Sequence, residues 1–268
     1  MPRPALLACA SLVLALAVPA RAALSPPGVN IRWDHCYDDG GALNKGFACD
    51  TNAGSERLVL SFALDAAKSD VSGQEIVVDL RTTGPTLPSW WSFKNVGTCR
   101  QSSLGVSLSV PPGAANCQDW AGGQAAGGIG AYNIGVLGPA TARIVLAAAV
   151  PATSLATLAD GTEYFVAQLT INHAKTVGTG ACAGCAEPVC IVLSSIHVTT
   201  PNIADDLRLM TGANGTDSQY VHWQGASVQD LHLSCPSPFR PCEVLYSCVL
   251  ASTPVRGSTW GAVKSLYR

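Results

Sequence analysis

Alternation of apolar and polar residues with a period of two is the feature that most constrains this chain. In the clearest case, Leu104, Val106, Leu108 and Val110 alternate with glycine and serine. Because side chains at i and i+2 of a strand share one face, this pattern predicts half-buried strands. Eight segments are predicted strands: residues 57–65, 74–82, 104–110, 142–150, 163–171, 189–199, 219–223 and 227–234.

Turn signals rich in glycine and proline separate these segments, and no long helical pattern occurs. Residues 153–159 are expected to form at most two helical turns. Residues 121–138 contain seven glycines and are expected to be a surface loop. Short strands at this spacing predict an all-β fold, an antiparallel β-sandwich of immunoglobulin-like or jelly-roll-like type.

The composition excludes several classes of protein. Hydrophobic residues make up 48% of the chain and charged residues only 13%, about half the usual fraction. So few charges argue against a coiled coil, a disordered charged tail and a nucleic-acid binder that neutralises phosphates.

Residues 1–22 have the pattern of a secretory signal peptide, with a short basic start, an apolar stretch and a small-x-small cleavage site. Their removal takes away Arg3 and Arg21 and moves the formal charge from −2 to −4. Lipid attachment at Cys9 is an alternative, although the apolar stretch continues beyond it. No later apolar run reaches the ~20 residues of a membrane span, so a secreted, extracytoplasmic protein without a span is expected.

The other ten cysteines are expected to form disulfides in an exported chain. They are Cys36, Cys49, Cys99, Cys117, Cys182, Cys185, Cys190, Cys235, Cys242 and Cys248. Spacing favours the pairs Cys36–Cys49 and Cys99–Cys117, which leaves two groups of three. Since each group is odd, at least one bond must join residues 182–190 to residues 235–248 if all ten are oxidised. Zinc held by Cys182, Cys185 and Cys190 with a nearby histidine is the alternative.

No catalytic motif is present, and the sequence predicts no catalytic residue, cofactor or metal. Paired carboxylates need no motif, so a secreted hydrolase stays open as an alternative. The acidic residues near predicted loops are Asp34, Asp38, Asp39, Asp50, Asp119, Asp205, Asp206 and Asp217. Turn formation is the main interpretation for them, with calcium binding as a second one.

Aromatic residues provide the predicted ligand site. Trp90 and Trp91 follow a proline-containing segment, Trp120 begins the glycine-rich stretch, and Tyr132 lies within it. A tryptophan facing solvent beside glycine-rich backbone is suited to stacking on a sugar ring. The alternative is that these rings pack inside the sandwich.

The C-terminal region is predicted to be separate from the sandwich. Residues 23–250 are expected to form one domain, followed by a linker over 251–258 and a short helical tail over 259–268. In the tail, Trp260, Val263 and Tyr267 would form one apolar stripe that needs a surface to dock on.

Several segments resemble a family of uncharacterised exported bacterial proteins. They include residues 71–80, 87–93, 124–133 and the ending TWGAVKSLYR of residues 259–268. This resemblance implies no activity. The strand order of residues 142–171 and 189–199 is weakly similar to that of cohesin-like and carbohydrate-binding sandwiches, and this likeness implies no site residue.

The sequence therefore predicts an exported, monomeric or weakly associating β-sandwich that binds a glycan or a cell-surface protein through Trp90, Trp91, Trp120 and Tyr132. Nucleic acid is not an expected partner. An enzyme is the less favoured function. A structural component of an envelope or extracellular assembly, with the tail as a docking tag, is a further alternative.

Overall fold

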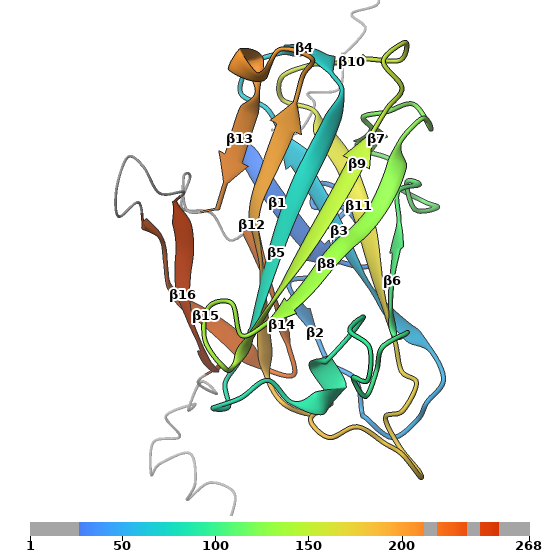
Figure 1. Cartoon of the computed structure of the whole chain (residues 1–268), viewed down its shortest axis with the longest axis vertical. Coiled ribbons are helices and arrows are strands. Elements are labelled where there is room, and N and C mark those ends of the chain that lie inside the picture. Colours follow the sequence, from blue (N-terminus) through green and yellow to red (C-terminus); the bar gives the residue numbers. More distant parts are fainter. Residues whose placement is uncertain (1–26, 212–218, 235–241, 252–268) are drawn as a thin grey trace, which may run out of the picture.

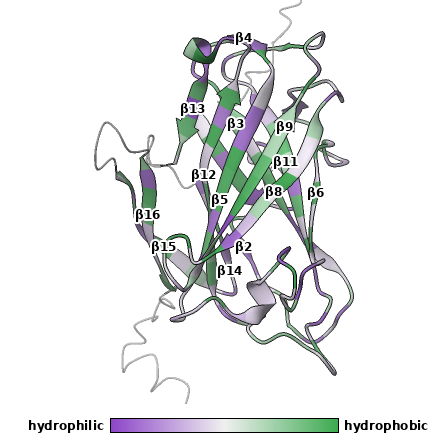
Figure 2. Ribbon diagram, in the orientation of Figure 1, coloured by the Kyte–Doolittle hydropathy of each residue, from purple (hydrophilic) through white to green (hydrophobic). Residues whose placement is uncertain are grey.

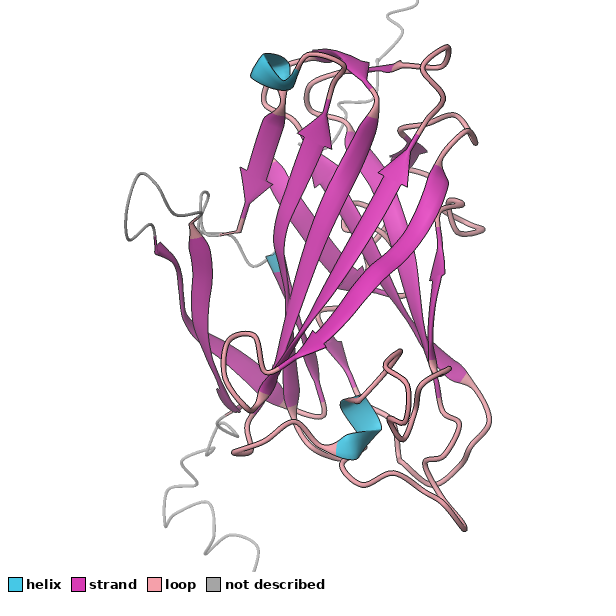
Figure 3. Cartoon of the chain, viewed as in Figure 1, coloured by secondary structure: helices cyan, strands magenta, loops and turns pink. Residues whose placement is uncertain are grey.

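In the part of the chain that the structure describes, strands are joined by turns and loops, and two single 3-10 turns are the helical elements (Figure 3). The computed structural model describes residues 27–211, 219–234 and 242–251. The strands up to residue 134 are β1 (Gly28–Trp33), β2 (Asn44–Lys45), β3 (Ser55–Ala63), β4 (Lys68–Val71), β5 (Gly73–Thr82), β6 (Leu104–Ser107), β7 (Cys117–Asp119) and β8 (Ala126–Ile134). The later strands are β9 (Thr141–Ala149), β10 (Ala156–Leu158), β11 (Glu163–Asn172), β12 (Val189–Thr199), β13 (Leu207–Met210), β14 (Tyr220–Trp223), β15 (Ala226–Ser234) and β16 (Glu243–Leu250). The 3-10 turns are η1 (Ser89–Trp91) and η2 (Ile203–Asp205).

Two sheets face each other and form the predicted β-sandwich (Figure 1). The first sheet has the order β1-β3-β11-β6, with β7 also paired to β11. The second sheet has the order β2-β14-β12-β5-β9-β8, with β13 also paired to β12. Among the described strands of these two sheets, pairing is antiparallel except between β7 and β11 and between β2 and β14. The all-β fold class predicted from the alternating segments is confirmed.

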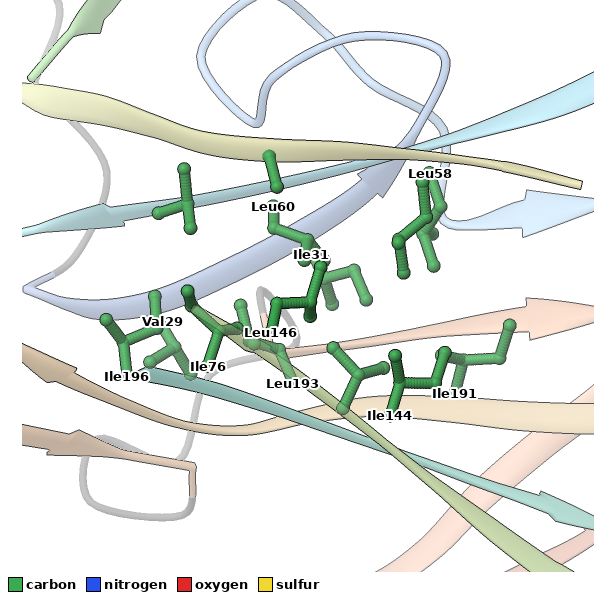
Figure 4. Close-up of a cluster of buried hydrophobic side chains, with 14 of the residues drawn as sticks. Val29, Ile31, Leu58, Leu60, Ile76, Ile144, Leu146, Ile191, Leu193 and Ile196 are labelled. Atoms are coloured by element: carbon green, nitrogen blue, oxygen red, sulfur yellow. The ribbon is translucent and has the colours of Figure 1, made fainter. Parts of the chain in front are cut away.

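Apolar side chains from the two inner faces form the core between the sheets. Figure 4 shows side chains of the first sheet, such as Leu58 and Leu60, opposite side chains of the second sheet, such as Ile144 and Leu193. In Figure 2 the hydrophobic colour is concentrated along the central strands. Burial of these side chains drives folding, at about 25 cal/mol for each Å² of apolar surface removed from water.

The first sheet is buried on both faces, which its alternating sequence does not predict. Val59 and Phe165 point away from the main core and pack with the disulfide of Cys36 and Cys117 in a second cluster. Cys36, in the loop after β1, and the segment before Cys117 of β7 cover these outward-facing side chains. Covered outer positions explain why β3 is buried over all residues from 58 to 63.

A hairpin of β15 and β16 packs on the outer face of the second sheet (Figure 1). The disulfide between Cys190 and Cys248 attaches it to β12. Arg81 of β5 donates a hydrogen bond to the carbonyl oxygen of Tyr246, and its guanidinium lies 5.7 Å from the ring centre of that residue. The hairpin therefore belongs to the sandwich and is not an independent unit.

The disulfides correct part of the predicted pairing. The pairs Cys36–Cys49 and Cys99–Cys117 are wrong, because Cys36 pairs with Cys117, Cys49 with Cys185 and Cys99 with Cys182. Cysteines that are neighbours in the sequence lie apart in the fold, and each of them pairs with a cysteine that is distant in the sequence. The predicted bond between the two groups of three is confirmed by Cys190–Cys248. Cys242 is disulfide-bonded as well, and Cys235 lies outside the described residues.

Two secondary-structure predictions are wrong. Within the predicted loop over 121–138, residues 126–134 form the edge strand β8. Within the predicted helical turns over 153–159, residues 156–158 form β10. The predicted signal peptide over 1–22, most of the linker over 251–258 and the tail over 259–268 lie outside the described residues.

The disulfides indicate that the chain folds in an oxidising, extracytoplasmic environment. In the part of the chain that the structure describes, there is no helix with the length and apolarity needed to cross a bilayer.

Candidate functional site

Three long connections meet at one end of the sandwich, at the bottom of Figure 3. They are the β2–β3 connection (residues 46–54), the β5–β6 connection (residues 83–103) and the β11–β12 connection (residues 173–188). We refer to these three segments together as the loop end. Loops on a rigid β scaffold are the usual location of binding residues, so this end is the first place to look for a site.

Two disulfides fix the loop end. Cys49 of the β2–β3 connection pairs with Cys185, and Cys99 of the β5–β6 connection pairs with Cys182. The side-chain oxygen of Asn52 also accepts hydrogen bonds from the backbone N–H groups of residues 176 and 177, at 2.7 and 3.0 Å. All three connections are therefore cross-linked to one another, which limits the conformational freedom of a surface formed by loops.

An aromatic cluster fills the interior beneath the loop end. Trp90 and Trp223 stack with ring centres 5.6 Å apart, and Trp91 meets Trp90 edge to face at 5.1 Å. Phe93 contacts both Trp91 and Tyr132, and the Tyr132 hydroxyl donates to the carbonyl oxygen of Trp91. Such ring pairs stabilise a core by about 0.5–1.5 kcal/mol each beyond the burial of their area.

The predicted stacking platform is corrected by this packing. Trp90 and Trp91 are fully buried, and Trp120 and Tyr132 are 4% and 3% exposed, so none of the four offers a ring face to a sugar. Trp120 also lies at the opposite end of β11 from the loop end. It follows β7, which pairs with the first residues of β11, whereas the loop end begins after the last residue of β11. The alternative of aromatic rings packed inside the sandwich is the one that holds.

Arg100 lies between this aromatic cluster and the surface. Its side chain is 1% exposed, and its guanidinium lies 3.6 Å from the ring centre of Trp90. It donates hydrogen bonds to the carbonyl oxygens of Trp90 at 2.8 Å, Ala174 at 3.0 Å and Asn172. Burial lowers the pKa of Arg100 to about 9, because the charged guanidinium is removed from water. Arg100 therefore holds a positive charge under the loop end at neutral pH.

A pocket of about 560 Å³ opens above Arg100. Its lining contains three basic side chains, of Lys94, Arg100 and Lys175, and no acidic one. The other polar groups of the lining come from Thr98, Gln101, Ser102 and Ser103. The Lys175 Nζ donates to the carbonyl oxygen of Cys99 at 2.7 Å, which places this ammonium group over the β5–β6 connection. We call this the loop-end pocket.

The acidic candidates serve mainly as hydrogen-bond acceptors for loops. Asp39 accepts from the backbone N–H groups of residues 115 and 116, Asp119 from those of residues 121 and 123, and Asp206 from that of Thr200. The local bonds of Asp119 and Asp206 agree with the interpretation as turn formers, whereas Asp39 joins two segments that are 76 positions apart. Asp34 pairs with Lys45 at 2.7 Å, and Asp217 lies outside the described residues.

Glu163 is a carboxyl group with a raised pKa, and burial is the main cause. It is fully buried and accepts hydrogen bonds from the N–H groups of Tyr37 and Asp38, at 2.9 and 2.8 Å, and from the Ser61 hydroxyl. A substrate in solution cannot reach this acid, so it does not supply the proton donor that hydrolysis by paired carboxylates needs. Its oxygens lie near the sulfurs of Cys36 and Cys117, which are bonded to each other and are not thiolate ligands.

The three basic residues of the pocket were missed by sequence reasoning. Lys94 and Lys175 are 81 positions apart and line one pocket because the Cys99–Cys182 bond and hydrogen bonds such as Arg100 to Ala174 join their two connections. The signal that could have found them is the small number of lysines, because the chain has only five and these two each lie within seven residues of a cysteine.

No protein-family model, curated protein or solved structure matches this chain.

Proposed function

We propose that this protein is an extracytoplasmic binding protein and that the loop end is its ligand-binding surface. The observation that carries the proposal is the loop-end pocket, a polar cavity of about 560 Å³ whose walls are held by the Cys99–Cys182 bond. A cavity of this volume is in the range of small-ligand sites. The ligand classes expected from the sequence, a glycan or a cell-surface protein, remain the candidates.

Rigidity supports binding at this end. A ligand that meets a preformed surface does not have to order the loops that hold it, and this lowers the entropic cost of association. The aromatic cluster supports the site from below, so three of the four residues predicted to stack on sugar, Trp90, Trp91 and Tyr132, lie beneath it. Trp90, for example, bonds through its backbone N–H to Ala183 of the β11–β12 connection at 2.9 Å.

The test is to fill the pocket with a bulky side chain. Ser102 is an exposed residue of the lining, so Ser102→Trp is expected to block the pocket without disturbing the core. Binding is measured by sedimentation with a panel of cell-wall and extracellular polysaccharides, both neutral and acidic, and with intact cells. The wild-type chain is expected to bind at least one of them, and Ser102→Trp is expected to lose that binding.

The matched control is Ser69→Trp, which places the same bulk at an exposed position in β4, outside the loop end. This control is expected to bind like the wild type. Equal loss in both variants, or no binding of the wild type to any member of the panel, would contradict the proposal.

A further inference from the structure

The loop-end pocket carries an excess of positive charge in an acidic protein. Three of its nine lining residues are basic and none is acidic, whereas the whole chain has 18 acidic and 16 basic residues. Lys94 and Lys175 are two of only five lysines. A pocket whose charge is opposite to that of its protein favours a ligand of negative charge.

The buried charge of Arg100 lacks a counter-charge. Its three hydrogen bonds are made to neutral carbonyl oxygens, and in the described part of the chain no carboxylate pairs with it. Asp79 shows the other arrangement, because its buried carboxylate meets Arg143 at 2.8 Å. Arg100 is 1% exposed, so a ligand does not contact its guanidinium directly, but the uncompensated positive charge beneath the pocket favours an anion in the space above it.

The backbone of both lysines is in an unfavourable conformation. Lys94 and Lys175 have φ angles of +60° and +61°, in the left-handed region that favours glycine. Residues in such strained conformations are concentrated at binding sites, where a particular side chain is needed in spite of its backbone. The chain thus holds two lysines beside the pocket at positions where glycine or asparagine would be less strained.

We propose that the loop-end pocket binds the acidic group of a glycan, a carboxylate or a sulfate, between Lys94 and Lys175 and above Arg100. This inference rests on the proposed function and names its ligand class. Ammonium groups bind such anions through charge-assisted hydrogen bonds. The hydroxyl and amide groups of Thr98, Gln101 and Ser102 surround the same space and match the hydroxyl groups of a sugar, which favours a glycan over an acidic peptide.

The test uses ligand pairs that differ in charge alone. Trigalacturonate is compared with its methyl ester, and a dextran sulfate oligosaccharide is compared with dextran, by titration calorimetry on the full chain. The charged member of at least one pair is expected to bind, and the neutral member is expected to bind at least tenfold more weakly. The two pairs distinguish a carboxylate from a sulfate.

Protein variants locate the binding. Lys94→Asn with Lys175→Asn removes both charges and places a residue that tolerates the left-handed region at each position. We expect this double variant to lose about tenfold or more in affinity, since each ammonium group supplies a charge-assisted hydrogen bond. Lys68→Asn, on β4, removes a lysine outside the loop end and is expected to change the affinity by less than twofold.

Three results would overturn this proposal while leaving the proposed function intact. The first is equal affinity for the charged and neutral members of each pair at a site that Ser102→Trp blocks. The second is unchanged affinity in the double lysine variant. The third is tighter, lysine-dependent binding of a polyglutamate peptide, which would make an acidic protein the ligand. Failure of the proposed function is a different result, because Ser102→Trp and Ser69→Trp would then behave alike.

Discussion

Glu163 and Arg100 are both buried charged side chains, and the surroundings of the two differ. The Glu163 carboxylate accepts hydrogen bonds from two backbone N–H groups and one hydroxyl, and the loop that supplies the N–H groups covers it. Arg100 donates to three carbonyl oxygens, yet it lines an open pocket beside two more basic residues. The Glu163 carboxylate is covered by the loop whose N–H groups donate to it. Arg100 instead lies beneath a pocket that a ligand can enter. Equal burial therefore accompanies a structural role in one case and a proposed binding role in the other.

The largest effect is expected when Arg100 is replaced by methionine. Arg100→Met keeps an apolar chain over Trp90 but leaves three carbonyl oxygens without their donor. An unsatisfied buried group costs about 1–3 kcal/mol, so we expect a loss of about 3 kcal/mol or more in the free energy of unfolding. Guanidinium unfolding measures it. Arg57→Met, at an exposed position, is the control and is expected to stay within about 0.5 kcal/mol of the wild type. A stable Arg100→Met would show that the carbonyl bonds are unimportant.

A smaller loss is expected for Glu163→Gln. The amide keeps the shape of the side chain but presents an NH₂ group where one carboxylate oxygen accepts a hydrogen bond, so a donor faces a donor. We expect a loss of about 2 kcal/mol in the same unfolding measurement. Glu75→Gln, at an exposed position of β5, should have little effect. If Glu163→Gln matched Glu75→Gln, the buried acid would not hold its loop.

The pH dependence of Glu163 sharpens the contrast. Burial raises the pKa of this carboxyl above its ordinary value of 4.5, so the folded state binds its proton more tightly than the unfolded state does. The resulting stabilisation is fully present below pH 4.5 and is lost as the pH rises through the folded-state pKa. Relative to Glu163→Gln, the wild type should therefore gain stability as the pH falls from 8 to 4.5. A difference that stays constant over this range would contradict the assigned direction.

The smallest effect, with the opposite sign, is expected at Lys94. Because its φ of +60° suits glycine, Lys94→Gly should raise the free energy of unfolding by about 1 kcal/mol while it weakens binding of the acidic glycan. Lys68→Gly serves as the comparison. Because Lys68 lies in strand β4, this variant is expected to lower the free energy of unfolding by about 0.5–1 kcal/mol. If Lys94→Gly destabilised the protein as much as Lys68→Gly does, backbone strain would not mark this site.

Local pattern predicted the long central strands well, but it missed β1 and β16 and predicted the site poorly. Alternation located β5 and β12 to within one residue, because each strand needs an inner face that its own sequence encodes. β8 was missed because its glycines suggested a loop. At Gly127 of this strand, a Cβ atom would lie 2.0 Å from the carbonyl oxygen of Ala147, so the close approach of two backbones requires glycine there.

The pairing of cysteines and the pocket depend on long-range contacts that spacing does not encode. Cys99 and Cys182 are 83 positions apart, and Arg100 owes its burial to the β11–β12 connection that they hold in place. Trp90 and Trp91 were predicted to stack on a sugar at the surface, but the burial of their large hydrophobic area places them in the core. The polar side chains of Lys94 and Lys175 line the pocket at the surface.

The most direct test of the account is a crystal structure of the full chain with an acidic oligosaccharide, such as trigalacturonate or a sulfated equivalent. The account predicts that an oxygen of the acidic group lies within about 3 Å of the Nζ atoms of Lys94 and Lys175, above Arg100. An oligosaccharide bound elsewhere, for example in the cleft that residues 243–247 of β16 form with Val136 and Leu137, would contradict it.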